Sequence, residues 1–248
     1  MVEKETEQHF DTVAKVWEQK VWVNLEEFDK KVIEFINAND QEIALDVGIG
    51  TGALAKKLPV KEMYGLDISV NMLTLCADHI LRHRLLKGTG KDIPFLDNSF
   101  DLVLARNVLK HTDDADLIIA EMHRVLKHNG RIIIIESSAL SKDLTEIPTM
   151  AMRVVEPYHP RFRSHDELID LITRKGFKNV EATIYTQAKK WLDKWCKAKN
   201  ATLQQRKMIF DLYKNAPEAF KIAEAVKLYE DELEVYCEFP WSMIKGYK

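Results

Sequence analysis

Most of the chain alternates between short apolar runs and stretches whose apolar residues recur every three or four positions. The apolar runs predict strands, and the three-to-four spacing predicts helices. Strands are expected at 42–48, 63–68, 100–108 and 131–137, with a weaker one at 85–90. Because several of these runs are apolar on both faces, the pattern predicts a parallel sheet between two layers of helices, joined by right-handed crossovers.

The predicted helices lie between these strands. They are expected at 25–36, from residue 52 to about residue 58, at 69–81 and at 112–126. A further helix begins at the capping box Ser164-His-Asp-Glu167 and ends at Gly176, before a strand at 179–187. Strand and helix therefore follow each other in the order that builds a doubly wound α/β domain.

The region 188–232 breaks this alternation, because it has helical patterns only. It carries Trp191 and Trp195 one turn apart and a second capping box, Thr202-Leu-Gln-Gln205. We expect a helical insertion here, followed by a last strand at 233–248. The two tryptophans lie among lysines and could face a membrane or an anionic substrate, but an apolar helical stripe is more often buried, which is the interpretation we favour.

A glycine-rich turn with an acidic residue before it follows the first predicted strand. Gly48, Gly50 and Gly52 allow a tight turn and close approach of the backbone to a ligand. With Ala53 the spacing also satisfies the dinucleotide pattern G-x-G-x-x-G/A. Asp46, however, would repel a pyrophosphate at this helix end, so the turn favours a ligand that carries an ammonium group and no phosphate.

Four motifs in order resemble the class I S-adenosylmethionine-dependent methyltransferases, and most closely their small-molecule branch of the ubiquinone and menaquinone biosynthesis type. The motifs are Leu45-Asp-Val-Gly-Ile-Gly-Thr-Gly52, Gly65-Leu-Asp-Ile-Ser69, Asp92-Ile-Pro-Phe95 and Asn98-Ser-Phe-Asp-Leu-Val103. The resemblance implies a doubly wound, mostly parallel, seven-stranded α/β sheet of the Rossmann-like methyltransferase type. It also implies an antiparallel last strand, which the insertion precedes here.

The resemblance further implies how S-adenosylmethionine would be held. Asp46 and the backbone of Gly48, Gly50 and Gly52 would meet its amino-acid end. Asp67 would accept the ribose hydroxyls, and Asp92 the adenine amine. The remaining cofactor contacts would be Ile68, Met72 and Ile93 around the adenine and Asn107, together with Arg106, at the methionine moiety. Carboxylates suit all three ligand groups, because an ionised carboxylate only accepts hydrogen bonds. We expect segment 1–40 to cover this site, 41–187 with 233–248 to form the core, and 188–232 to act as a lid.

Two histidines are the candidate catalytic residues. His111 follows the strand at 100–108, and His159 lies in a loop after the strand at 131–137. Either can act as a base near neutral pH, although alignment alone can supply much of a methyl-transfer rate. Tyr158, Met150 and Met152 would be walls of the acceptor site.

Composition narrows the remaining choices. The three cysteines are far apart and no Cys/His spacing suits zinc, so neither a disulfide nor a metal site is predicted. The N-terminus is acidic and no apolar run is long enough to span a bilayer, so we expect a cytoplasmic protein. We expect a small-molecule methyl acceptor and either a monomer or a homodimer.

Two other functions remain open. Residues 188–227 carry 10 basic and 4 acidic side chains and could form the footprint of a tRNA or DNA methyltransferase. Arg106-Asn-Val-Leu109 lacks the Asn/Asp-Pro-Pro-aromatic tetrad of base-amine methyltransferases, and no cysteine follows a proline, so nucleic acid is the weaker interpretation. A non-catalytic, cofactor-binding partner subunit is the third possibility.

Overall fold

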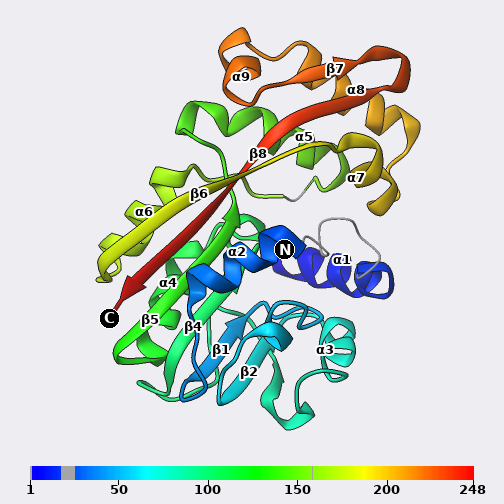
Figure 1. Cartoon of the computed structure of the whole chain (residues 1–248). Helices are drawn as coiled ribbons and strands as arrows, with labels where there is room; N and C mark the ends of the chain where they lie inside the picture. The colour runs from blue at the N-terminus through cyan, green and yellow to red at the C-terminus, as the bar shows by residue number, and fades with distance from the viewer. Residues whose placement is uncertain (1, 18–25, 158) are drawn as a thin grey trace.

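A mixed sheet organises the chain in the computed structural model, which describes residues 2–17, 26–157 and 159–248. The strand order is β3-β2-β1-β4-β5-β8-β6, and β7 pairs with β8 at one end (Figure 1). The strands are β1 (Ile43–Val47), β2 (Glu62–Asp67), β3 (Leu85–Lys87), β4 (Phe100–Arg106), β5 (Leu126–Ser137), β6 (Lys178–Lys190), β7 (Lys227–Tyr229) and β8 (Glu234–Tyr247). Neighbours from β3 to β5 pair in parallel, whereas β8 runs antiparallel to both β5 and β6.

Helices cover both faces of this sheet. The helices are α1 (Val2–Trp17), α2 (Glu26–Ile36), α3 (Val70–Cys76), α4 (Ala115–Val125), α5 (Glu146–Val155), α6 (His165–Arg174), α7 (Leu192–Ala198), α8 (Leu203–Lys214) and α9 (Glu218–Ala223). One apolar core joins α4 and α6 to the sheet, and a second core joins α2 and α3 to its other face. The alternate isoleucines of β5 divide between these cores, since Ile132 and Ile134 belong to the first and Ile133 and Ile135 to the second.

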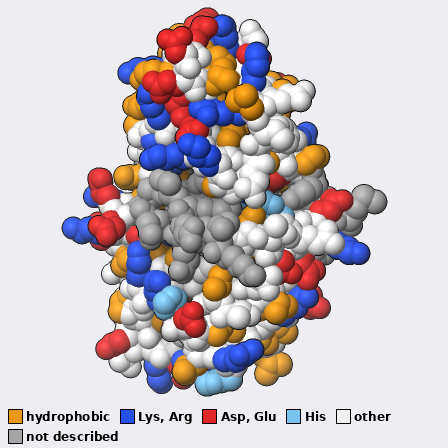
Figure 2. All heavy atoms as spheres, turned by 90° about the vertical axis from the view of Figure 1, so that its right-hand side faces the viewer, with side chains coloured by type: hydrophobic (Ala, Val, Ile, Leu, Met, Phe, Trp, Pro, Cys, Tyr) orange, Lys and Arg blue, Asp and Glu red, His pale blue; other side chains and the backbone are white. Residues whose placement is uncertain are grey.

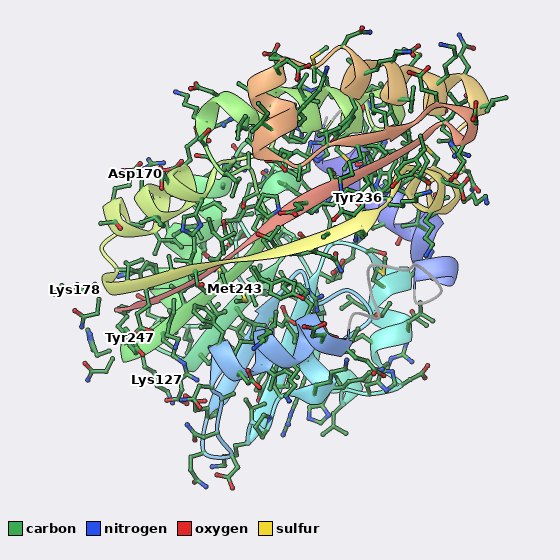
Figure 3. All side chains as sticks on the ribbon, turned by 45° about the horizontal axis from the view of Figure 1, so that its top comes forward. Lys127, Asp170, Lys178, Tyr236, Met243 and Tyr247 are labelled. Atoms are coloured by element: carbon green, nitrogen blue, oxygen red, sulfur yellow. The ribbon has the colours of Figure 1, made fainter. Side chains whose placement is uncertain are left out.

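A third apolar core holds the insertion against α5 and the first half of β8. Strands β6 and β8 are long enough to reach from the main sheet into this upper part, as Figure 1 shows. Figure 3 labels Lys178 and Tyr247, which lie opposite each other at one end of the pair, and Tyr236 near the other end. There Tyr236 pairs with Lys190. The insertion is therefore connected to the core through strands of the same sheet.

The predicted doubly wound fold, its antiparallel last strand and the helices before that strand are confirmed. The sheet has eight strands where seven were predicted, because the insertion returns through the short strand β7. The capping boxes at Ser164 and Thr202 are both formed, and Ser69 caps α3 as its side chain accepts a hydrogen bond from the Met72 amide.

The predicted helix after the glycine turn is wrong. Only a 3₁₀ turn, Ala55–Lys57, forms there. Gly48, Gly50 and Gly52 all have positive φ, so no regular helix can start before residue 53. Leu58 is extended, as expected for a residue that precedes a proline. The segment 53–57 between these two limits is too short for a stable α-helix.

Helix α1 is anchored across the top of α3. The Ser69 hydroxyl donates to the Asp11 carboxylate (2.5 Å), and the Asn71 side-chain amide donates to the Asp11 carbonyl (3.0 Å). Val13 and Ala14 pack with Met72 in a small apolar cluster. Among the described residues, no helix has the length and apolar character needed to cross a membrane.

Candidate functional site

A cavity of about 870 Å³ lies at the carboxyl ends of β1, β2 and β4. Its walls also include α1, the end of α5, the start of the insertion and part of β8. This is the edge of an open α/β sheet at which ligands usually bind. The volume is near the upper end for small-molecule sites and leaves room for two ligands side by side.

The glycine turn forms the floor of one end of the cavity. The amides of Gly48 and Ile49 both donate to the Leu66 carbonyl, at 2.7 and 3.1 Å, which ties the turn to β2. Gly48 has a φ of 73°, and a Cβ there would lie 2.5 Å from a methyl carbon of Val108. Gly50 also has positive φ, but a Cβ there would meet nothing within 4 Å, which leaves its surface open to a ligand.

Two carboxylates lie beside this turn. Asp67 accepts hydrogen bonds from the amides of Gly50 (2.8 Å) and Ser69 (2.9 Å). Burial raises the pKa of Asp67 to about 6, and these two amides oppose the shift. Burial also raises the pKa of Asp46 to about 8, with the negative charge of Asp67 as a second cause. The Oδ1 atom of Asp46 is buried and has no hydrogen-bond partner in the part of the chain that the structure describes.

Two histidines lie at the other end of the cavity. The ring centroids of His111 and His159 are 5.5 Å apart, and the His159 ring stacks on Phe162. Burial lowers the pKa of His159 to about 4 and holds the pKa of His111 well below its ordinary value, so both rings are neutral at pH 7. Lys199, from the insertion, forms an ion pair with Glu156, which His9 of α1 also contacts at 3.5 Å.

A buried network holds the 3₁₀ turn that carries His111, Leu109–His111. The Glu136 carboxylate accepts a hydrogen bond from the Leu109 amide at 2.8 Å, and Arg163 donates hydrogen bonds to the carbonyls of Leu109 and Thr112. Burial raises the pKa of Glu136 to about 7, with Lys110 opposing the shift. Both ends of the turn are therefore fixed by side chains from other elements, which limits the movement of the His111 ring.

Comparison with known proteins gives the family of this chain. The family model described as "Methyltransferase domain" matches residues 45–134. An uncharacterised protein of Methanocaldococcus jannaschii, MJ1123, is 33% identical over 141 residues, which cover 56% of this chain and 66% of that protein. The demethylmenaquinone methyltransferase of Lactobacillus johnsonii is 30% identical over 183 residues, covering 62% of this chain and 75% of that protein. The chain belongs to the class I S-adenosylmethionine-dependent methyltransferases.

The fold of this methyltransferase is also found among solved structures. The YcgJ protein of Bacillus subtilis superposes with a TM-score of 0.81 at 21% identity, covering 90% of this chain and 98% of that chain. The predicted enzyme class and the predicted cofactor, S-adenosylmethionine, are therefore confirmed. The acid pair and the glycine turn fit this cofactor, because the unpartnered oxygen of Asp46 is free to accept a hydrogen bond from an ammonium group.

The structure brings most of the predicted site residues of the methyltransferase to the cavity. The residues on the cavity wall are Asp46, Gly48, Gly50, Asp67, Ile68, Met72, Asn107, His111 and His159. Gly52, Asp92 and Ile93 are not on the wall: Asp92 is exposed and Ile93 is part of the main core. Their roles, like those of the other predicted site residues, stay predictions.

Of the predicted acceptor walls, Met152 lines the cavity, Met150 is 41% exposed and off it, and Tyr158 lies outside the described residues. Trp191 and Trp195 are buried, at 5 and 9% exposure, and both also reach the cavity. Three lysines also line the cavity: Lys189 and Lys199 belong to the lysines around the two tryptophans, whereas nothing in the sequence analysis pointed to Lys110. No local pattern marks Lys110, because it meets the other two lysines only in the fold.

Proposed function

We propose that this methyltransferase transfers the methyl group of S-adenosylmethionine to an oxygen, nitrogen or carbon atom of a small metabolite with an aromatic or quinone-like ring. The observation that carries the proposal is a single cavity with two chemically different ends. Asp46, Asp67 and the glycine turn line one part of the wall, whereas aromatic rings, lysines and the two histidines line another part, together with Glu156. The first end suits the cationic donor, and the second suits a flat acceptor that carries electron-rich oxygens.

Aromatic rings form most of the acceptor end. Trp191, Trp195, Phe239 and Trp241 all lie on the cavity wall, and the ring of Trp191 meets Phe239 edge-on at 5.3 Å. The indole N–H of Trp241 is buried and has no partner among the described residues. A phenol or quinone oxygen would satisfy this donor while the ring of the acceptor packs against the aromatic walls.

Basic side chains add to this preference. Lys189 lies on the cavity wall, and burial lowers its pKa to about 8. Lys110 is also on the wall and donates to Asn107 and Ser137, at 3.1 and 2.8 Å. A phenolate or carboxylate on the acceptor would be attracted to these ammonium groups. The name of the Lactobacillus johnsonii relative, a demethylmenaquinone methyltransferase, points to an acceptor of the quinone type for that protein.

The roles of the chain's own residues follow from their places on the wall. Asp46 would accept a hydrogen bond from the donor's ammonium group, Asp67 would accept from its ribose, and Ile68 with Met72 would pack on its adenine. Asn107 would contact the methionine moiety. S-adenosylmethionine supplies the electrophilic methyl group, so the main task of the protein is to align the acceptor and exclude water.

His111 and His159 would act at the acceptor end, where a ring nitrogen can accept a hydrogen bond from a hydroxyl or amine. We further propose that segment 1–40, through α1, and segment 188–232, through α7, cover the core formed by 41–187 and 233–248. Phe10 of α1 supports this arrangement, because its ring meets that of His111 edge-on at 5.1 Å.

The basic insertion gives little support to a nucleic-acid substrate. Many of its cations are paired with carboxylates, for example Arg206 with Asp193 and Lys214 with Glu230. On the face that Figure 2 shows, basic and acidic side chains alternate over the upper part of the molecule. A nucleic-acid footprint would need a continuous basic surface.

The test is methyl transfer from labelled S-adenosylmethionine to a panel of hydroquinones, phenols, aromatic acids and amines, with bulk tRNA as a further substrate. We expect label in one of the small aromatic classes. The variants His111→Ala and His159→Ala should lower kcat while S-adenosylhomocysteine still binds, and the exposed His128→Ala should behave as wild type. Label that enters tRNA alone would contradict the proposal, as would the absence of any S-adenosylhomocysteine binding.

A further inference from the structure

Three side chains with metal-binding atoms meet at the acceptor end of the cavity. His111 comes from the turn after β4, Glu156 follows α5, and His159 lies three residues further on. One potential ligand atom from each lies within 4.8 Å of the other two. All three line the cavity.

The state of His159 points to a ligand in this space. His159 is only 2% exposed, and neither of its ring nitrogens has a hydrogen-bond partner in the described part of the chain. Stacking on Phe162, at a centroid distance of 5.6 Å and an interplanar angle of 7°, holds the ring in place. A buried imidazole without partners is costly, and histidines of this kind are frequent metal ligands.

We propose that His111, Glu156 and His159 bind a divalent transition-metal ion such as Zn²⁺, Co²⁺ or Fe²⁺. Two imidazole nitrogens and one carboxylate oxygen are a ligand set that these ions accept, and they leave coordination positions for an oxygen or nitrogen of the methyl acceptor. The inference deepens the proposed function and rests on it, because the ion would orient the acceptor at the end of the cavity assigned to it above. No Cys/His spacing in the sequence indicated this site, since residues 111 and 156 meet only in the fold.

The positive charges near Glu156 predict how a substitution at Lys199 changes the affinity for a metal ion. Lys199 and His9 both contact the Oε1 atom of Glu156. Lys110, on the same wall, adds a second positive charge. Lys199 therefore competes with a metal ion for Glu156, and its removal should strengthen metal binding.

The test is a Co²⁺ titration of the full-length protein without donor or acceptor, followed by ligand-field absorption. We expect one saturable equivalent of Co²⁺ per chain, displaced by Zn²⁺. His159→Ala and His111→Ala should abolish the absorption, and Glu156→Gln should weaken binding. Lys199→Met should tighten binding by about tenfold, because a unit charge close to a partly buried ion is removed. His128→Ala, at an exposed histidine, is the matched control.

Calorimetry with S-adenosylhomocysteine on the same samples shows that each variant is folded and separates the two proposals. A protein that binds S-adenosylhomocysteine and methylates its acceptor after chelation, but takes up no Co²⁺, would overturn the metal site and leave the proposed function standing. Absorption that survives both histidine substitutions would also overturn the metal site. Co²⁺ bound as expected by a protein that methylates no small acceptor would overturn the proposed function instead.

Discussion

Replacing Asp46 by asparagine should stabilise the unliganded protein and weaken donor binding at the same time. Asp46 is 3% exposed, and its Oδ1 atom has no partner among the described residues. Burial, and next to it the charge of Asp67, raise the pKa of Asp46 to about 8. In the unfolded chain the same carboxyl has its ordinary pKa near 3.8. Asparagine has the same shape and never ionises, so the variant removes the cost of this charge.

The sign and size follow from the two pKa values. Between pH 4 and pH 8 the folded state keeps a proton on Asp46 that the unfolded state releases, so the free energy of unfolding falls as pH rises through this window. At pH 7 the pKa difference corresponds to an upper limit of about 4 kcal/mol. The new amide needs hydrogen-bond partners of its own, which offsets part of this gain, so we expect a net gain of about 1–3 kcal/mol.

The assay compares thermal unfolding of wild type and Asp46→Asn from pH 5 to pH 8, with and without S-adenosylhomocysteine. Without ligand the variant should melt higher at pH 7, by roughly 2–4 °C per kcal/mol, and the difference should shrink toward pH 5. At saturating ligand the order should reverse, because binding at a hundred times Kd adds about 2.7 kcal/mol to wild type. A variant that melts lower without ligand at pH 7, or that binds S-adenosylhomocysteine as tightly as wild type, would refute the reasoning.

Three further predictions test the neighbouring residues. Asp67→Ala should weaken binding of both S-adenosylhomocysteine and methylthioadenosine by roughly 10-fold or more, since it removes the expected ribose contact and the charge-assisted hydrogen bonds from the amides of Gly50 in the turn and Ser69 before α3. Asp46→Asn should spare methylthioadenosine, which has no ammonium group. Calorimetry measures both ligands, and equal losses for the two variants would contradict the assignment. Gly48→Ala should lower the free energy of unfolding in urea by more than about 3 kcal/mol, because the new Cβ would press on Val108 and the backbone there is left-handed. Gly50→Ala should lower it by only about 1–2 kcal/mol, because only the left-handed backbone is strained. A Gly50 variant that is the less stable of the two would count against the geometry. Arg163→Met should lower kcat at least several-fold with the donor Kd unchanged, because it removes the hydrogen bonds that hold the turn carrying His111. Steady-state kinetics in which only the donor KM changed would contradict this.

Local sequence rules predicted the elements whose causes are local. The alternation of buried runs and amphipathic segments, the caps at Ser69, Ser164 and Thr202, and the acid before the glycine turn all depend on residues within a few positions of each other. The helix predicted after the glycine turn does not form, because Gly48, Gly50 and Gly52 have backbone conformations that only glycine adopts readily and that cannot begin a helix. The apolar pattern there suited a helix, but the available length did not.

The sequence by itself determined the fold class, the family and the cofactor, because short motifs at a glycine turn and at strand ends carry that information. Only the tertiary structure showed which side chains meet at the end of the cavity proposed for the acceptor. His111, Glu156 and Lys199 lie far apart along the chain and meet because β4, α5 and the insertion bring them to one edge of the sheet. The burial of Asp46 and His159, and therefore their pKa values, has the same origin: it depends on what packs over a residue, which no pattern of neighbouring residues records.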